Sequence, residues 1–243
     1  MRFIRIVSMF MTFFFWLTPG LRAEDGLTIA AGAGYKRLVE QLCTAYTAKT
    51  GVQVQEIFGN MGQVTAQAKE SGTVDFIMGD KSYLDTTTLS YAGEYVIGKG
   101  KLIAAVAKGV NIKSLDDLTG QTVTRIAIAD SKKAIFGHAA AEFLTRKGLW
   151  EQVQPKLLVV GTVPQITAYV VSGEVDIGFI NLTEAMAIEG KVGLLLPVDE
   201  NLYSPILIVA KRLQQSKNTK AAESFIAFLQ SEEAQVMIKQ QGL

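Results

Sequence analysis

The sequence predicts an α/β protein built from two similar lobes that are joined by two strand-like crossings. Three observations lead to this prediction. In both halves of the chain, short apolar runs alternate with segments of helical periodicity, as in layered α/β folds. One pattern, a helix-closing glycine followed by an acidic residue and a buried strand, recurs after 101 residues. Two further extended apolar segments are suited to carry the chain from one lobe to the other.

The two halves show the same order of elements. In the first half we expect strands at 27–31, 52–58 and 74–78, and helices at 35–46 and 63–70. In the second half we expect strands at 124–129, 156–160 and 175–180, and helices at 139–147 and 163–171. Glycines close these helices, as Gly51 does after the first one. The repeated order favours two lobes of similar topology.

The repeat places Asp75 and Asp176 at equivalent positions, just before a buried strand and after Gly72 and Gly173. A carboxylate in such a position can accept hydrogen bonds from backbone N–H groups. We therefore expect both aspartates to cap backbone groups and not to act as an acid and a base. The alternative is that a glycine cap before a strand recurs independently in any α/β protein.

The crossings define the domain boundaries. The candidate crossing segments are residues 94–107 and 203–210. Lobe 1 is expected to consist of residues 24–100 and 203–243, and lobe 2 of residues 101–202. The amphipathic tail would pack back on lobe 1. Two lobes that are joined twice enclose a cleft, which is where a ligand is expected.

The first 23 residues have the organisation of a secretory signal peptide. Arg2 and Arg5 precede twelve apolar residues at 6–17, and the expected cleavage site follows Ala23. A run of this length is too short for a membrane span, which needs about 20 residues. No later segment approaches that length, so we expect a soluble protein exported to the periplasm.

Composition excludes several functional classes. The 243 residues include 24 basic and 23 acidic side chains, and cleavage after Ala23 would leave 21 and 23, a net charge of −2. Such a chain lacks the basic surface that nucleic-acid binding requires, so no nucleic-acid partner is expected. With Cys43 and His138 as the single residues of their types, the chain has no internal disulfide, multi-cysteine zinc site or paired-histidine motif.

The reactive side chains form no convincing catalytic pair. Cys43 lies on the apolar face of a predicted helix, so we expect it to be buried and inert. His138 lies at a helix start beside the presumed cleft, where contact with a ligand and an ordinary surface position are both open. We expect no enzyme, no cofactor and no metal site. An enzyme and a ligand-sensing module are the rival classes.

Three glycine-containing turns are candidates for the ligand site, at residues 32–35, 59–63 and 136–138. Glycine lets the backbone approach a ligand, and the free N–H groups of a helix start favour an anion. The neighbouring side chains are small or neutral, so the expected site binds an anion through uncharged donors. For each turn alone, a glycine that only closes the turn is a sufficient explanation.

Several stretches together are similar to one known family. They are residues 27–34, 50–54, 58–61, 75–80, 148–150 with 155–157, 173–178 and 203–206. In these stretches the chain resembles the periplasmic molybdate- and tungstate-binding proteins of ABC importers, which have the type II solute-binding fold. The resemblance extends from about residue 27 to residue 243. It implies an exported, monomeric receptor that captures a small anion and delivers it to an ABC permease in the inner membrane.

The resemblance also implies a set of ligand-binding positions. They are Ala33, Gly34, Asn60, Met61, Phe136, Gly137, Val163 and Asn181, with His138 and Tyr35 behind them. Gly34 stands where the family has a serine, residues 60–62 replace a serine run, and Asn181 replaces a tyrosine. Asn60, Asn181 and backbone N–H groups could supply the missing donors. Alternatively, the pocket takes another oxyanion, an organic acid or a soft metal near Met61 and His138.

Overall fold

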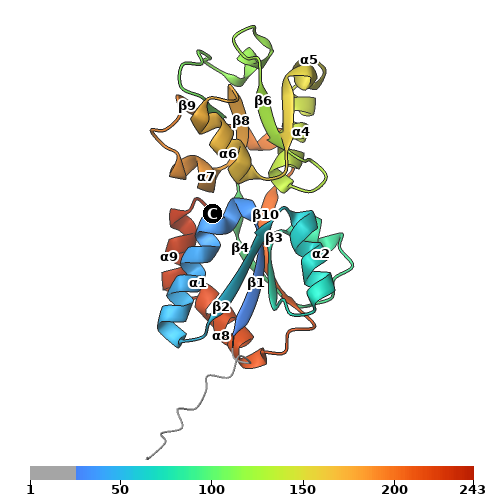
Figure 1. Cartoon of the computed structure of the whole chain (residues 1–243), viewed down its shortest axis with the longest axis vertical. Helices are drawn as coiled ribbons and strands as arrows, with labels where there is room; N and C mark the ends of the chain where they lie inside the picture. Colours follow the sequence, from blue (N-terminus) through green and yellow to red (C-terminus); the bar gives the residue numbers. More distant parts are fainter. Residues whose placement is uncertain (1–25) are drawn as a thin grey trace, which may run out of the picture.

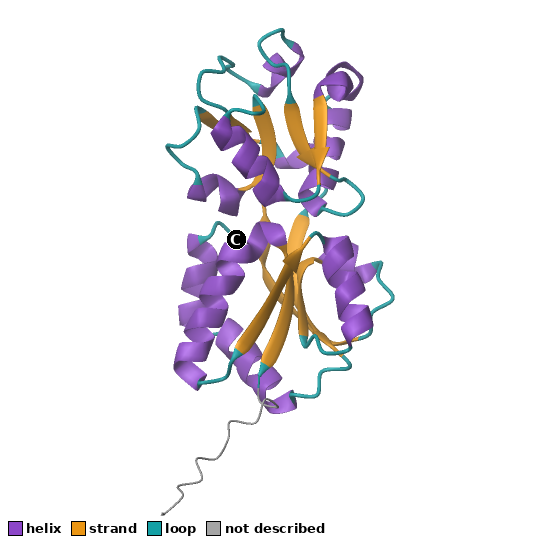
Figure 2. Cartoon of the chain, in the orientation of Figure 1, coloured by secondary structure: helices purple, strands orange, loops and turns teal. Residues whose placement is uncertain are grey.

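The computed structural model describes residues 26–243, which form two α/β lobes, one above the other in Figure 1. Each lobe contains a five-stranded mixed sheet, and helices cover its faces (Figure 2). The predicted α/β class and the two-lobe architecture are confirmed. The predicted signal peptide, residues 1–23, lies outside the described residues. Within residues 26–243, no helix combines the length and apolar character that a membrane crossing requires.

Lobe 1 is built from the N-terminal part of the chain and its C-terminal tail. Its elements are β1 (Leu27–Gly32), the 3-10 helix η1 (Ala33–Tyr35), α1 (Lys36–Thr50), β2 (Val54–Gly59), α2 (Met61–Ser71), β3 (Phe76–Asp80), α3 (Lys81–Asp85), β4 (Tyr91–Gly100), β10 (Ile206–Leu213), α8 (Thr219–Leu229) and α9 (Glu232–Gln240). The strand order is β2-β1-β3-β10-β4. Strands β1, β2 and β3 are parallel, and β10 runs antiparallel between β3 and β4.

Lobe 2 is built from the middle of the chain. Its elements are β5 (Leu102–Val106), η2 (Leu115–Thr119), β6 (Ile126–Ala129), α4 (Ile135–Arg146), α5 (Trp150–Val153), η3 (Gln154–Lys156), β7 (Leu157–Val160), α6 (Val163–Ser172), β8 (Ile177–Asn181), α7 (Leu182–Ala187), β9 (Leu194–Pro197) and η4 (Glu200–Leu202). The strand order is β7-β6-β8-β5-β9, with β6 parallel to β7 and β8 and with β5 antiparallel to its neighbours. This order matches that of lobe 1 strand for strand.

The chain passes between the sheets at two neighbouring places. It leaves lobe 1 at Lys101, between β4 and β5, and returns after η4 on the way to β10. The Leu102 N–H donates a 3.2 Å hydrogen bond to the Tyr203 hydroxyl, so the two crossings are tied together. The segment 94–107 thus contributes to both sheets, because its two strands pair in different lobes.

Asp75 and Asp176 occupy equivalent places in the two sheets, as the sequence repeat predicts. Asp75 Oδ2 accepts a 2.8 Å hydrogen bond from the N–H of Thr28 in the neighbouring strand β1. Asp176 Oδ2 accepts hydrogen bonds of 2.6 and 2.9 Å from the N–H groups of Thr124 and Arg125, just before β6. The predicted capping role of both aspartates is confirmed.

The C-terminal tail packs on lobe 1, as its amphipathic pattern predicts. It forms two helices, and Ser231 caps the second one. Tyr46 of α1 donates a 3.0 Å hydrogen bond to the Ala221 carbonyl, and its ring lies 5.1 Å from that of Phe225. Cys43 on the same face of α1 is buried, and burial raises the pKa of its thiol far above the ordinary value. Its expected burial is confirmed, and the raised pKa disfavours the thiolate, which is the nucleophilic form.

Candidate functional site

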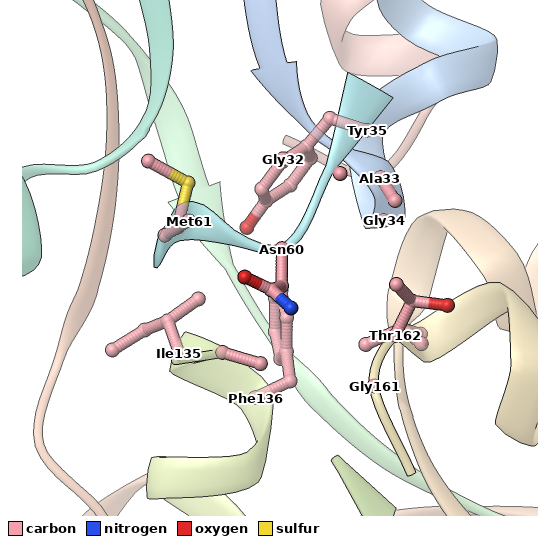
Figure 3. Close-up of a pocket in the computed structure, with 13 residues that line it drawn as sticks. Gly32, Ala33, Gly34, Tyr35, Asn60, Met61, Ile135, Phe136, Gly161 and Thr162 are labelled. Atoms are coloured by element: carbon pink, nitrogen blue, oxygen red, sulfur yellow. The ribbon is translucent and has the colours of Figure 1, made fainter. Parts of the chain in front are cut away.

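Four strand-to-helix turns meet between the lobes and line one small cavity (Figure 3). The turns follow β1 and β2 in lobe 1 and β6 and β7 in lobe 2. They contribute residues 32–35, 59–61, 134–136 and 161–163. The cavity volume is about 30 Å³, more than the ~10–15 Å³ that one water molecule needs. In this arrangement of the lobes, the cavity therefore has room only for a compact ligand.

The lining of the cavity is polar at a few points and uncharged throughout. Its polar side chains are those of Tyr35, Asn60 and Thr162, and none of the lining residues is acidic or basic. In Figure 3 the Tyr35 hydroxyl and the Asn60 amide are directed into the space between the labelled residues. A ligand in this cavity would therefore meet hydrogen-bonding groups and dipoles and not a full countercharge.

Three of the four helix starts at the cavity lack a side-chain cap. These are η1, which continues into α1, and the longer helices α4 and α6. The first N–H groups of a helix have no acceptor within that helix, and they carry the positive end of its dipole. A helix start without a cap leaves these donors for a ligand, and an anion is the ligand they favour.

Asn60 caps the fourth helix, α2, in a way that fixes its amide. Its Oδ1 accepts a 3.0 Å hydrogen bond from the Gln63 N–H, and the Gln63 side chain accepts one of 3.0 Å from the Asn60 N–H. This capping box commits the oxygen of the Asn60 amide to the helix. The Nδ2 group, with two N–H donors, is the part of the side chain left for the cavity.

Tyr35 places a buried hydroxyl at the cavity. The residue is 4% exposed, and its hydroxyl has no hydrogen-bond partner among the described residues. Its ring lies 5.9 Å from that of Phe136, which brings side chains of the two lobes together. Burial, and then the negative charge of Asp80, raises the pKa of the Tyr35 hydroxyl well above its ordinary value. The hydroxyl therefore keeps its proton and is a hydrogen-bond donor without a protein acceptor.

Most of the predicted ligand positions come together at this cavity. Those that line it are Ala33, Gly34, Tyr35, Asn60, Met61, Phe136 and Val163. The Met61 N–H is already used, since it donates a 3.0 Å hydrogen bond across the cleft to the Lys133 carbonyl. Met61 is therefore placed to contribute its side chain and not its backbone donor.

Gly137, His138 and Asn181 are not among the residues that line the cavity. A Cβ atom at Gly137 would lie 2.2 Å from the Ala129 carbonyl oxygen, so glycine here lets α4 start close to the end of β6. His138 is exposed, and its Nε2 lies 3.5 Å from Glu142 Oε1 on the same helix. Asn181 is buried, and its Nδ2 donates a 2.8 Å hydrogen bond to the Gly34 carbonyl.

Sequence reasoning missed part of the site. Ile135 and Thr162 line the cavity, and the turn after β7 completes it. A signal for this turn was present, because Gly161 follows a predicted strand and precedes a predicted helix, as in the other three turns. Of Met61 and His138, considered together as metal ligands, Met61 lines the cavity and His138 does not. Within residues 26–243, no group of three His, Cys, Asp or Glu side chains is placed to hold a metal ion.

Comparison with known proteins gives consistent results along the described chain. The sequence model of a family described as bacterial extracellular solute-binding protein matches residues 27–243. The molybdate-binding protein ModA of Rhodobacter capsulatus is 27% identical over 228 residues, covering 91% of this chain and 90% of that protein. A putative ABC transporter substrate-binding lipoprotein, YvgL of Bacillus subtilis, is 24% identical over 224 residues, covering 89% and 85%.

The fold also matches solved structures. The periplasmic molybdate-binding protein of Azotobacter vinelandii superposes with a TM-score of 0.81 at 24% sequence identity. The match covers 89% of this chain and 97% of that one. At this identity the match establishes the two-lobe fold.

Proposed function

This chain belongs to the family of bacterial extracellular solute-binding proteins, and we propose that its solute is a small oxyanion of the molybdate type, held in the cavity between the lobes. One observation carries the proposal. The uncapped starts of the η1–α1 segment, α4 and α6 converge on a single cavity whose lining includes no charged side chain. Convergent N–H donors without a countercharge suit a compact anion with several acceptor oxygens.

The donors come from both lobes. The proposed set is the backbone N–H groups of Ala33, Gly34, Phe136 and Val163, together with the Tyr35 hydroxyl and the Asn60 Nδ2 group. Tyr35 and Asn60 take the place of hydroxyl donors expected from the resemblance but absent from this chain. Gly137, His138 and Asn181 have no direct contact with the ligand in this proposal.

The global charge of the chain does not attract an anion. Without residues 1–23 the chain has 21 basic and 23 acidic side chains, so affinity must arise inside the cavity. Hydrogen bonds to a charged partner contribute roughly 1.5–3 kcal/mol each. A few such bonds in a closed cavity are sufficient for tight binding, because micromolar affinity corresponds to about 8 kcal/mol.

The proposed cellular role follows from the family and the N-terminal sequence. We propose that the protein is exported to the periplasm with cleavage near Ala23, acts as a monomer without catalysis, and delivers its ligand to an ABC permease in the inner membrane. Support comes from the similarity to a putative ABC transporter substrate-binding lipoprotein. Mass spectrometry of the protein from a periplasmic fraction tests export. A protein that keeps Met1 and stays in the cytoplasm would contradict it.

A panel of anions tests the ligand class. Purified protein is mixed with molybdate, tungstate, sulfate, phosphate and lactate, and thermal unfolding and calorimetry are recorded for each. A ligand present at 1,000 times its dissociation constant should add about 4 kcal/mol to the free energy of unfolding. No stabilisation by any of the four inorganic oxyanions at millimolar concentration would rule out the oxyanion. Stabilisation by lactate alone would favour an organic acid.

Asn60→Asp gives a matched test of the cavity. Aspartate caps a helix as well as asparagine does, so α2 and the fold are retained. The change replaces two N–H donors with a negative charge, and anion affinity should fall roughly 100-fold or more. Asn60→Ser keeps the cap without adding charge, so its anion affinity should fall less. Equal anion affinity in wild type and Asn60→Asp would show that this side chain does not face the ligand.

A further inference from the structure

The turn after the third strand has equivalents in the two lobes. Asp80 ends β3 and precedes the short helix α3, and Asn181 ends β8 and precedes α7. The two residues are 101 positions apart, the same spacing that relates Asp75 to Asp176. Both are buried, and each has one side-chain oxygen without a hydrogen-bond partner in the described part of the chain. The comparison therefore concerns the same place in two similar lobes.

In lobe 1, Asp80 accepts its hydrogen bonds from within its own turn. Asp80 Oδ1 accepts a 2.8 Å hydrogen bond from the Tyr83 N–H and a further one from the Ser82 hydroxyl. The carboxylate therefore caps its own helix, α3, in the usual manner of an N-terminal aspartate.

In lobe 2 the polar side chains of the same turn reach the other lobe. Asn181 makes no cap on α7, and its Nδ2 donates a 2.8 Å hydrogen bond to the Gly34 carbonyl. Thr183 Oγ1 donates one of 2.8 Å to the Gln241 carbonyl in the C-terminal tail. Figure 1 shows α7 facing the start of α1 and the C-terminus across the space between the lobes.

An ion pair completes this connection. Arg37 Nε lies 3.3 Å from Glu184 Oε1, and the side chains are 52% and 5% exposed, respectively. Glu184 is thus a buried carboxylate whose cationic partner belongs to the other lobe. A buried charge that loses its partner is strongly destabilising, whereas a charge that regains water is not. Because opening of the cleft separates the pair, Arg37 stabilises the closed arrangement more than an open one.

We propose that residues 181–184 form a latch that holds the two lobes closed and thereby sets how fast a bound solute leaves. The counterpart residues Asp80 and Ser82 bind within their own lobe, whereas Asn181, Thr183 and Glu184 all bind the opposite one. In the lobe 2 turn, contacts to the opposite lobe stand in place of a helix cap, and opening of the cleft would separate their partners. None of the three latch side chains lines the ligand cavity, so the latch acts on closure and not through ligand contact.

Arg37→Ala tests the latch because it removes one partner while leaving the cavity lining unchanged. Small-angle X-ray scattering of the purified protein without added anion should show a larger radius of gyration for Arg37→Ala than for wild type. The matched control is Lys49→Ala, which breaks a 2.9 Å ion pair with Glu233 that lies within lobe 1. This control should scatter like wild type. If Arg37→Ala and wild type have the same radius of gyration, the latch does not hold the lobes closed.

Kinetics with sodium molybdate as the probe give a second readout. This part of the inference rests on the proposed function, whereas the scattering experiment does not. Arg37→Ala should raise the dissociation rate roughly tenfold, since loss of one partner of a buried pair acts mainly on dissociation. The double variant Arg37→Ala, Glu184→Gln removes the unpaired charge as well, so its dissociation rate should return towards that of Glu184→Gln alone.

The outcomes separate the two proposals. Absence of binding of molybdate, tungstate, sulfate and phosphate to wild type, with expanded scattering for Arg37→Ala, would contradict the oxyanion proposal and support the latch. Molybdate binding with equal dissociation rates in wild type and Arg37→Ala would overturn the latch and leave the oxyanion proposal in place. Thermal unfolding of each variant shows whether the fold is intact, and a closure effect in a variant of wild-type stability supports the latch directly.

Discussion

The two lobes share one topology but contribute different chemistry to the cavity between them. Both sheets have the same strand order, and in both the two turns at the cavity follow the first two parallel strands of the lobe. Lobe 1 adds polar side chains, the Tyr35 hydroxyl and the Asn60 amide. Lobe 2 presents mainly apolar side chains, such as Ile135 and Phe136, around helix starts without side-chain caps.

This difference shows that the residues at the cleft can differ between two lobes that have the same strand order. Strand order and the aspartates that tie strand starts are retained in both lobes, because a change there disrupts the buried sheet. The turn residues at the cleft differ between the lobes, although several of them, such as Tyr35, Met61 and Phe136, are buried. The same contrast separates Asp80, which binds its own helix, from Asn181, which binds the other lobe.

The largest expected effect is a loss of folding stability caused by a substitution in the first turn of α4. Gly137→Ala in lobe 2 should lower the free energy of unfolding by about 3 kcal/mol, because the new Cβ would lie 2.2 Å from the Ala129 carbonyl oxygen. Gly62→Ala in the first turn of α2 in lobe 1 should stay within about 1 kcal/mol of wild type, since its nearest neighbour would be 3.3 Å away. Urea unfolding at 25 °C measures both.

The stability losses of the two variants show whether the starts of α4 and α2 differ in how closely they are packed. Loss of soluble folded protein for Gly137→Ala would agree with the prediction. Wild-type stability for Gly137→Ala, or equal losses for both variants, would show that the start of α4 can move away from β6 as easily as α2 adjusts.

The next effect concerns the side-chain donors. Tyr35→Phe in lobe 1 should weaken molybdate binding by roughly 10-fold to 100-fold, the equivalent of one hydrogen bond to a charged partner. The same change removes a buried hydroxyl that has no hydrogen-bond partner within residues 26–243, so the ligand-free protein should gain up to about 1 kcal/mol in stability. Thr162→Val, which removes the half-buried hydroxyl of lobe 2, should weaken binding less.

Calorimetric titration and urea unfolding test this pair of variants. Weaker binding combined with higher stability would identify the Tyr35 hydroxyl as a ligand donor. A larger loss of affinity for Thr162→Val than for Tyr35→Phe would reverse the assignment of side-chain donors to lobe 1.

The smallest effect concerns the equivalent aspartates. Burial opposes ionisation of Asp176, but hydrogen bonds from Thr124 and Arg125 outweigh it and hold the pKa of the carboxyl below its ordinary value. Asp176→Asn should therefore lower the free energy of unfolding by roughly 1–2 kcal/mol at pH 7. A depressed folded-state pKa gives stability above the unfolded value of about 3.9, and this stability is lost as the pH falls through the folded value. The difference from wild type should shrink below about pH 4.

Asp75→Asn is the matched variant in lobe 1. A similar decrease in the free energy of unfolding at pH 7 would support the equivalence of the two aspartates. A decrease in only one of the two variants would contradict it. Urea unfolding at pH 7 and near pH 3 provides the comparison. A difference between Asp176→Asn and wild type that does not depend on pH would show that ionisation of Asp176 is not the source of its contribution.

Local patterns were sufficient to predict most of the fold. Apolar periodicity places the strands and helices, and glycine closes helices where a left-handed residue is needed, as at Gly72 and Gly173, with φ of 63° and 78°. The spacing of Asp75 and Asp176 shows the two-lobe repeat before any coordinates. The helix, strand and cap signals can be recognised because each depends on residues a few positions apart, and the repeat can be recognised because the same local pattern occurs twice.

The site was predicted less completely, for a physical reason. The turns containing Gly34 and Asn60 have local signatures, and both line the cavity. The side chains of Ile135 and Thr162 carry no such signal, because an apolar side chain and a lone threonine at a helix start are common outside any site, although Gly161 marked the turn that contains Thr162. The site also depends on which turns of the two lobes face each other. That is decided by the relative position of two separate sheets.

The sequence by itself determined the α/β class, the duplicated order of elements, the burial of Cys43 and the capping aspartates, because these follow from periodicity and from a local pattern that occurs twice. Only the tertiary structure decided that Asn181 binds Gly34 and that Arg37 pairs with Glu184, since each partner lies 147 positions away along the chain. Such contacts form when folding brings two lobes together, and no local pattern specifies them.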